Sequence, residues 1–145
     1  MKIFKIYSLI IVLFLSLSLF NIAHADCNIS DKSALKGKDL AGCNLQNADL
    51  YRADLEGANL RDANLIFANL GGANLRDAVL EVANLSGTYL EGANLTAANL
   101  TRAYLTGANL RDANLKGANL LRANLEGATW VDGRTCAKKS IGECL

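Results

Sequence analysis

The 145-residue chain contains no proline, a single histidine and no excess of charge of either sign. Its 15 Lys and Arg residues against 14 Asp and Glu residues give a formal net charge of +1 at pH 7. A strongly acidic or basic surface, of the kind that imitates or binds nucleic acid, is therefore missing. The absence of proline fits a fold in which backbone amides bond to the neighbouring layers of the chain, because proline has no amide hydrogen to donate.

Leucine, by contrast, occurs at every fifth position from Leu35 to Leu125, and Trp130 takes the next place in this register. A step of five residues turns an α-helix by about 500°, so successive leucines would spiral around the helix and share no face. In a flat strand an odd spacing places them on opposite faces in turn. What remains is a chain that turns a corner after each pentad, so that every leucine points to one central axis. The sequence therefore predicts an all-β fold, a β-solenoid.

Two other positions of the pentad support this prediction. From residue 48 to residue 128 the residue two places before the central one is alanine in every pentad but one, where Thr88 stands. A second inward position beside a leucine has room only for a small side chain. Gly or Asp often stands two places after the leucine, where a corner needs a residue that tolerates a tight or positive-φ conformation.

The run Ala-Asn/Asp-Leu-x-x, seen at residues 53–55, 73–75 and 118–120, resembles the pentapeptide-repeat family. The match covers roughly residues 33–132. The resemblance implies a right-handed quadrilateral β-helix with four pentads in each coil, closed by short N- and C-terminal caps. About five such coils, stacked about 4.8 Å apart, would make a rod about 24 Å long.

The segment ahead of the repeats has the features of a secretory signal peptide. Lys2 and Lys5 form a basic start, residues 6–20 are mostly apolar, and Ala23-His24-Ala25 is a small-x-small cleavage site. We expect cleavage after Ala25 and a periplasmic or secreted protein; the alternative is an uncleaved membrane anchor, since the apolar run is nearly long enough. We divide the chain into a signal peptide (1–25), an N-terminal cap (26–37), a β-helix (38–132) and a C-terminal cap (133–145).

Four cysteines remain after cleavage, an even number that in an oxidising compartment indicates two disulfides. Cys27 and Cys43 lie at the start of the rod, whereas Cys136 and Cys144 lie at its end, too far away for the Cα separation of about 7 Å that a disulfide allows. The favoured pairs are therefore Cys27–Cys43 and Cys136–Cys144, each closing one end. The alternative for Cys43 is a buried free thiol. A zinc site is disfavoured, because the mature chain has no histidine and the thiols sit at opposite ends.

Trp130 stands where the register calls for leucine, at the end of the last pentad. We interpret it as a core residue that covers the last coil; the alternative is a side chain on which a ligand stacks.

The balance of charge distinguishes a DNA-mimicking protein from a structural or protein-binding module. Well-known members of the family resemble B-form DNA and protect DNA gyrase, which requires a strongly acidic surface. Here residues 26–145 carry 13 Lys and Arg against 14 Asp and Glu, and the position before leucine is mostly Asn. We find no constellation of catalytic, cofactor-binding or metal-binding residues, and we expect no nucleic acid and no small-molecule substrate. The sequence favours an exported, non-enzymatic structural or protein-binding module, with a DNA mimic that binds gyrase as the alternative.

The twenty-residue period implied by the resemblance also sorts the outward side chains. It brings a candidate protein-binding set together on neighbouring positions, with ordinary scatter of apolar surface residues as the alternative. The set consists of Ile66, Phe67, Val82, Tyr89 and Tyr104.

The same period stacks residues of opposite charge one strand spacing apart. Such pairs contribute about 0.2–1 kcal/mol each, and the alternative is that they are simply solvated. The predicted pairs are Glu56 with Arg76, Arg61 with Glu81, and Glu91 with Arg111.

Overall fold

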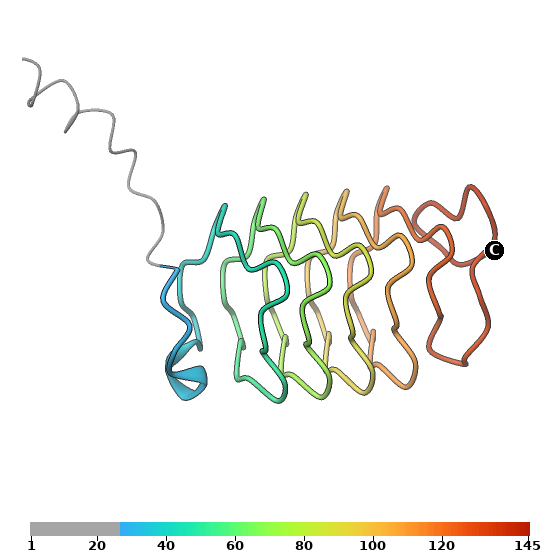
Figure 1. Ribbon diagram of the computed structural model, residues 1–145. Helices are drawn as coiled ribbons and strands as arrows, with labels where there is room; N and C mark the ends of the chain where they lie inside the picture. The colour runs from blue at the N-terminus through green and yellow to red at the C-terminus, as the bar shows by residue number, and fades with distance from the viewer. Residues whose placement is uncertain (1–26) are drawn as a thin grey trace, which may run out of the picture.

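The computed structural model describes residues 27–145, so the predicted signal peptide and its cleavage site lie outside the described residues. These residues form a rod of stacked turns of chain, with the C-terminus at one end (Figure 1). Each parallel β-bridge joins residues twenty apart, from Asp39 with Asn59 to Asn109 with Thr129. Four pentads therefore bring the chain back to the same position one layer further along the rod.

Each corner is a hydrogen-bonded turn of four residues that begins at the leucine. The amide of Ala58, for example, donates to the carbonyl of Leu55 at 3.0 Å. The third residue of this turn, Gly57, has a φ of 65°, as in a type II turn. Phe67 and Val82 occupy the same position of their turns with φ of 56° and 61°. A β-branched residue such as Val82 rarely adopts this conformation, so the stacking of layers outweighs local preference there.

In several columns the Asn and Asp residues before the leucines form ladders of side-chain hydrogen bonds along the outside of the rod. The side-chain oxygen of Asn74 accepts the amide of Arg76 at 3.3 Å and the Nδ2 group of Asn94 at 3.2 Å. At the base of the same column Asp54 accepts the Nδ2 group of Asn74 at 3.1 Å. Because a carboxylate only accepts, the aspartate ends the ladder without leaving an amide donor unpaired.

The inward leucines form one continuous core, as the sequence predicts. Leu50 to Leu110 are each fully buried, and alanine fills the small position beside them. The exception, Thr88, is also fully buried, and its hydroxyl donates to the carbonyl of Leu65 at 2.7 Å. The interpretation of Trp130 as a core residue is supported, since it is partly buried and packs against the core.

A short segment closes the N-terminal end of the rod. It contains the 3-10 helix η1, Lys32–Ala34, whose N-cap Asp31 accepts the amide of Ser33 at 3.0 Å. The hydrogen bonds from Ser33 hold the pKa of Asp31 below its usual range. Lys32 contacts Asp49 in the first coil, with Nζ and Oδ2 2.7 Å apart.

The C-terminal end is covered differently, by chain that runs back along the last coil. Antiparallel bridges join Thr135 to Thr129 and Ile141 to Asn124. The amide of Leu125 donates to the carbonyl of Ser140 at 2.8 Å. The cap therefore continues the wall of the rod.

The cysteines are placed in the two pairs that the sequence favours. Cys27 and Cys43 stand at disulfide distance with their Cα atoms 5.6 Å apart, and Cys136 and Cys144 do so at 4.9 Å. Cys43 occupies the small inward position and is buried there, and it is also the partner of Cys27. Its burial therefore does not require a free thiol. Within residues 27–145 no helix is both long and apolar enough to cross a bilayer.

Candidate protein-interaction surface

The five apolar residues of the candidate set differ in how far they project from the rod. Phe67, Tyr89 and Tyr104 are 57%, 55% and 49% exposed. Ile66 and Val82 are only partly exposed. The three aromatic side chains are therefore the members that a partner can reach.

The ring of Phe67 lies against the next layer of the rod. A methyl group added at Gly87 would collide with this ring, and Gly87 itself has a φ of 64°. Glycine there satisfies both the turn and the close approach of the ring. The ring of Phe67 therefore packs against Gly87 while more than half of the residue stays exposed.

The register places these residues around one corner of the rod. Ile66 and Phe67 are the corner residues of one layer, and Tyr89 follows the same corner one layer on. Tyr104 belongs to the side that leads into this corner, where it forms parallel bridges with the layers before and after it, and Val82 stands at the corner before that side. The predicted set thus spans two adjacent sides. We call Phe67, Tyr89 and Tyr104 the aromatic corner.

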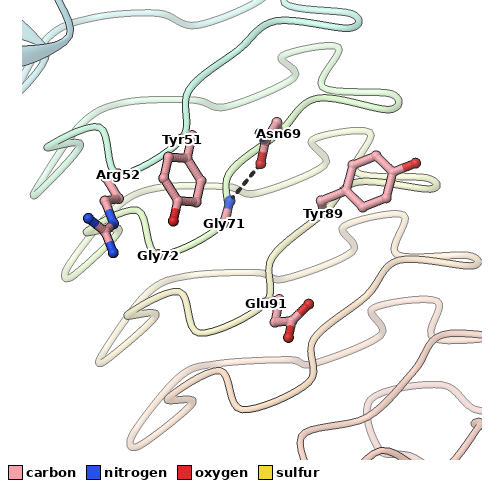
Figure 2. Close-up of a pocket in the computed structure, with 7 residues that line it drawn as sticks. All are labelled: Tyr51, Arg52, Asn69, Gly71, Gly72, Tyr89 and Glu91. Atoms are coloured by element: carbon pink, nitrogen blue, oxygen red, sulfur yellow. Dashed lines mark hydrogen bonds between the residues drawn. The ribbon is translucent and has the colours of Figure 1, made fainter.

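An open hollow of about 590 Å³ lies next to the aromatic corner, with Tyr89 in its lining (Figure 2). The residues that line it come from three successive layers: Tyr51, Arg52, Asn69, Gly71, Gly72, Tyr89 and Glu91.

The hollow exists because Gly71 and Gly72 are the one pair of corner residues in the repeats that both lack a side chain. The ring of Tyr51 lies over the first of them, 3.2 Å from where a Cβ would stand, and Arg52 lies over the second. The guanidinium carbon of Arg52 is 5.2 Å from the centre of the Tyr51 ring. Of these residues only Tyr89 was in the predicted set; the double glycine is the sequence signal that marks the place.

The predicted charge pairs are only partly correct. Arg61 and Glu81 contact each other across layers, with Nη1 and Oε2 2.8 Å apart. The other two arginines instead contact the aspartate next to them in the chain, Arg76 with Asp77 at 3.1 Å and Arg111 with Asp112 at 3.7 Å. Each of these corners brings an arginine and the following aspartate to the same point of the surface, and Arg61 likewise lies 3.7 Å from Asp62 in addition to its contact with Glu81. The carboxylates left without their predicted arginine are those of Glu56 and Glu91.

Among residues 27–145, no group of three or more His, Cys, Asp or Glu side chains is placed to hold a metal ion.

The family model for pentapeptide repeats (8 copies) matches residues 32–62, 58–96 and 93–129. The chain belongs to the pentapeptide repeat family. No curated protein sequence matches it. Solved structures of pentapeptide repeat proteins do match, and these neighbours imply a right-handed quadrilateral β-helix.

One similar structure is HetL, a pentapeptide repeat protein involved in heterocyst differentiation regulation in the cyanobacterium Nostoc sp. strain PCC 7120. It is 40% identical over 70% of this chain and 52% of HetL, with a TM-score of 0.59. The chain thus spans about half the length of this relative. A pentapeptide repeat protein from the Arabidopsis thaliana thylakoid lumen is 35% identical over 72% of both chains, with a TM-score of 0.45. QnrB1, a plasmid-mediated fluoroquinolone resistance protein, is 19% identical over 73% of this chain and 62% of its own, with a TM-score of 0.49.

Proposed function

We propose that this pentapeptide repeat protein is an exported, non-enzymatic scaffold that binds a protein partner through its aromatic corner. The observation that carries the proposal is that Phe67, Tyr89 and Tyr104 are each about half exposed and lie within a few layers of one corner. Aromatic side chains are enriched at protein interfaces, and tyrosine is among the residues that most often carry a large share of the binding energy.

The rod favours such binding because it is rigid. Its outward side chains are fixed to a backbone that bonds to the layers before and after it, and a packed ring such as that of Phe67 loses little freedom on binding. We propose that the rod has about five coils. Because its layers are stacked at a constant distance, the three rings of the aromatic corner are presented to the partner at a fixed spacing.

Export is supported by the N-terminal sequence and by the cysteines. The basic start, apolar run and small-x-small site of residues 1–25 are typical of a signal peptide. Cysteine pairs at disulfide distance at both ends of the rod suit a protein that matures in an oxidising compartment. We propose that the mature protein begins at Asp26 and works in the periplasm or outside the cell.

The surface charges favour this function over imitation of DNA. Cations lie among the acids, as in the contact between Arg61 and Glu81, so no continuous acidic face forms along that row. A gyrase-binding DNA mimic is the alternative that the test below must exclude.

The test is capture of partners from periplasmic and cytoplasmic extracts by the purified mature protein. Replacing Phe67 and Tyr89 by serine should abolish capture of the periplasmic partner, because both rings are more than half exposed. Thermal unfolding should change little. A matched control, Arg111→Ser with Asp112→Ser at another corner, should leave capture intact.

Two outcomes would overturn the proposal. One is a serine variant that folds and captures the same partner as the unaltered protein. The other is an intact mass that includes residues 1–25 together with capture of gyrase from the cytoplasmic extract, which would favour the DNA mimic.

A further inference from the structure

The last coil of the rod has an open β-edge on two of its four sides, formed by residues 113–122. In the layer before it, Leu95 donates its amide to the carbonyl of Asn114 at 2.8 Å, and Leu100 donates to Asn119 at 2.8 Å. In the described chain the corresponding amides of the last coil donate to no backbone carbonyl, because the C-terminal cap forms its β-bridges with the other two sides. Gly142 of the cap lies beside the backbone of Leu120 and Arg122 but accepts no hydrogen bond from them. These open donors are the amides of Leu115, Gly117, Leu120 and Arg122.

Apolar side chains accompany the open donors. Leu115, Ala118 and Leu120 pack against the core but are only partly buried, whereas the same positions one layer earlier are fully buried. Leu121, at the adjoining corner, is 62% exposed. An edge with unpaired amides and exposed apolar side chains is a template for an added strand.

Three cations at or next to this edge have no ion-pair partner among residues 27–145. Lys116, Arg102 and Arg122 form no ion pair with any residue of the described chain. Arg102 and Arg122 are twenty residues apart, so they stack in adjacent layers, where like charges repel. The nearby carboxylate of Asp132 is already engaged by Arg134, with Oδ2 and Nε 3.3 Å apart.

The rod itself shows which charge fits above such a cation. Lys36 occupies the same column as Lys116, and in the layer above Lys36 stands Glu56, with Nζ and Oε1 3.2 Å apart. Residues 33–42 lie in the same columns as residues 113–122, and the segment that pairs with them in the next layer is residues 53–62. This segment ends on Asp62, in the column of Arg122.

We propose that residues 113–122 bind an acidic segment of a partner protein, which pairs with the open edge on both sides and turns with the rod at the corner formed by residues 115–118. Its small and apolar residues face Leu115 and Leu120, and its carboxylates lie over Lys116 and Arg122. The open amides supply the pairing, and the cations select acidic strands. This site lies at the end of the rod, apart from the aromatic corner, and does not depend on the function proposed for that corner.

The probe is a synthetic peptide with the sequence of residues 53–62, added to the purified mature protein at about millimolar concentration. Hydrogen exchange of the four open amides should be fast in the free protein and should slow at least about fivefold with the peptide. A peptide with Glu56 and Asp62 both replaced by lysine should give no protection.

A charge swap provides the matched variant. Lys116→Glu with Arg122→Glu, both at exposed side chains, should lose protection by the acidic peptide and gain it from the lysine peptide. Lys138→Glu with Lys139→Glu, in the turn of the cap, is the control and should bind as the unaltered protein does. The Phe67→Ser, Tyr89→Ser variant should also bind the peptide, which separates this site from the aromatic corner.

Three results would overturn the proposal. The first is equal protection by both peptides, which would mean that charge does not select the strand. The second is protection that grows with protein concentration in the absence of peptide, accompanied by a larger sedimentation coefficient, which would assign the edge to a second copy of the chain. The third is a complete lack of protection by the acidic peptide in the unaltered, folded protein.

Discussion

The two ends of the rod are both closed by about a dozen residues and a pair of cysteines at disulfide distance, yet they are covered to different extents. At the N-terminal end Leu35, Leu40 and Leu45 are at most 3% exposed. At the C-terminal end Leu115 and Leu120 are partly exposed. The difference lies in the path of the two caps.

Both caps reach the core, but in the described chain only the C-terminal cap also forms β-bridges with the wall. Cys136 and Cys144 are buried in the core. Ile29 packs against the core from the N-terminal cap. In the C-terminal cap, Thr135 and Ile141 also pair with the backbone of the last coil.

A cap that pairs with the wall satisfies the amides of the sides it covers and leaves the others open. The comparison shows that the end of a repeat rod must both cover its leucines and pair its backbone amides. The N-terminal cap covers the leucines, whereas the C-terminal cap pairs the amides of two sides and leaves Leu115 and Leu120 partly exposed.

The largest effect is expected away from both ends, at the middle of the rod. Leu85→Asp places an unpaired charge in a core that has nothing to pair with it, and should lower the free energy of unfolding by more than about 4 kcal/mol. Arg76→Gln, at an exposed ion pair, should change it by less than about 1 kcal/mol. Urea titration of both variants checks this. A Leu85→Asp variant close to the unaltered protein would contradict the inward orientation of the leucines.

The comparison of the ends is tested by the same substitution at both. Leu35→Ala removes a side chain that is 1% exposed, and should cost about 2–5 kcal/mol. Leu115→Ala occupies the same column at the open end, where water already reaches the leucine, so we expect less than about half of that cost. Urea titration again gives the values. Equal costs would mean that the two ends are equally covered.

The sequence was sufficient for what the repeat itself determines. The inward leucines, the small residue beside them and the tolerant corner position follow from spacing, because each layer repeats the constraint of the one before. The cysteine pairs follow from the length of the rod, which keeps Cys27 and Cys43 apart from Cys136 and Cys144. The twenty-residue period came from the family resemblance, and the bridges between Asp39 and Asn59 and their successors agree with it.

What the sequence could not predict depends on long side chains at the corners and on the path of the caps. Arg76 had two carboxylates within reach, and only the structure shows that it contacts Asp77. The hollow beside Tyr89 depends on the rings and chains that lie over Gly71 and Gly72. The open edge at Leu115 and Leu120 depends on which sides the C-terminal cap covers, and the cap has no repeat to indicate this.

The two cysteine pairs give the next smaller effect. Replacing Cys27 and Cys43 by alanine opens a loop with a sequence separation of 16, and should cost about 3 kcal/mol. Replacing Cys136 and Cys144 opens one of 8, and should cost about 2.5 kcal/mol. Thiol titration of the mature protein under non-reducing conditions should first find no free thiol.

Limited proteolysis then distinguishes the ends. We expect the N-terminal variant to destabilise the whole rod, because Cys43 is part of the buried core. The C-terminal variant should lose its last residues to protease while the rod stays folded. A free Cys43 in the unaltered protein would instead support its role as a buried thiol that only fills space.

The smallest effect concerns how the N-terminal cap is attached. The hydrogen bond from Lys32, together with one from the amide of Tyr51, holds the pKa of Asp49 below its usual range. A carboxyl group whose pKa is lowered by folding contributes stability above its unfolded pKa of about 4, and this is lost as the pH falls through the folded pKa. Carbon NMR titration of the Asp49 carboxyl should therefore give a pKa below that of a model peptide. Lys32→Gln should raise the pKa part of the way back, because the amide of Tyr51 remains. If Asp49 titrates as in a model peptide, Lys32 does not hold η1 to the first coil, and the N-terminal end is less firmly closed than its buried leucines indicate.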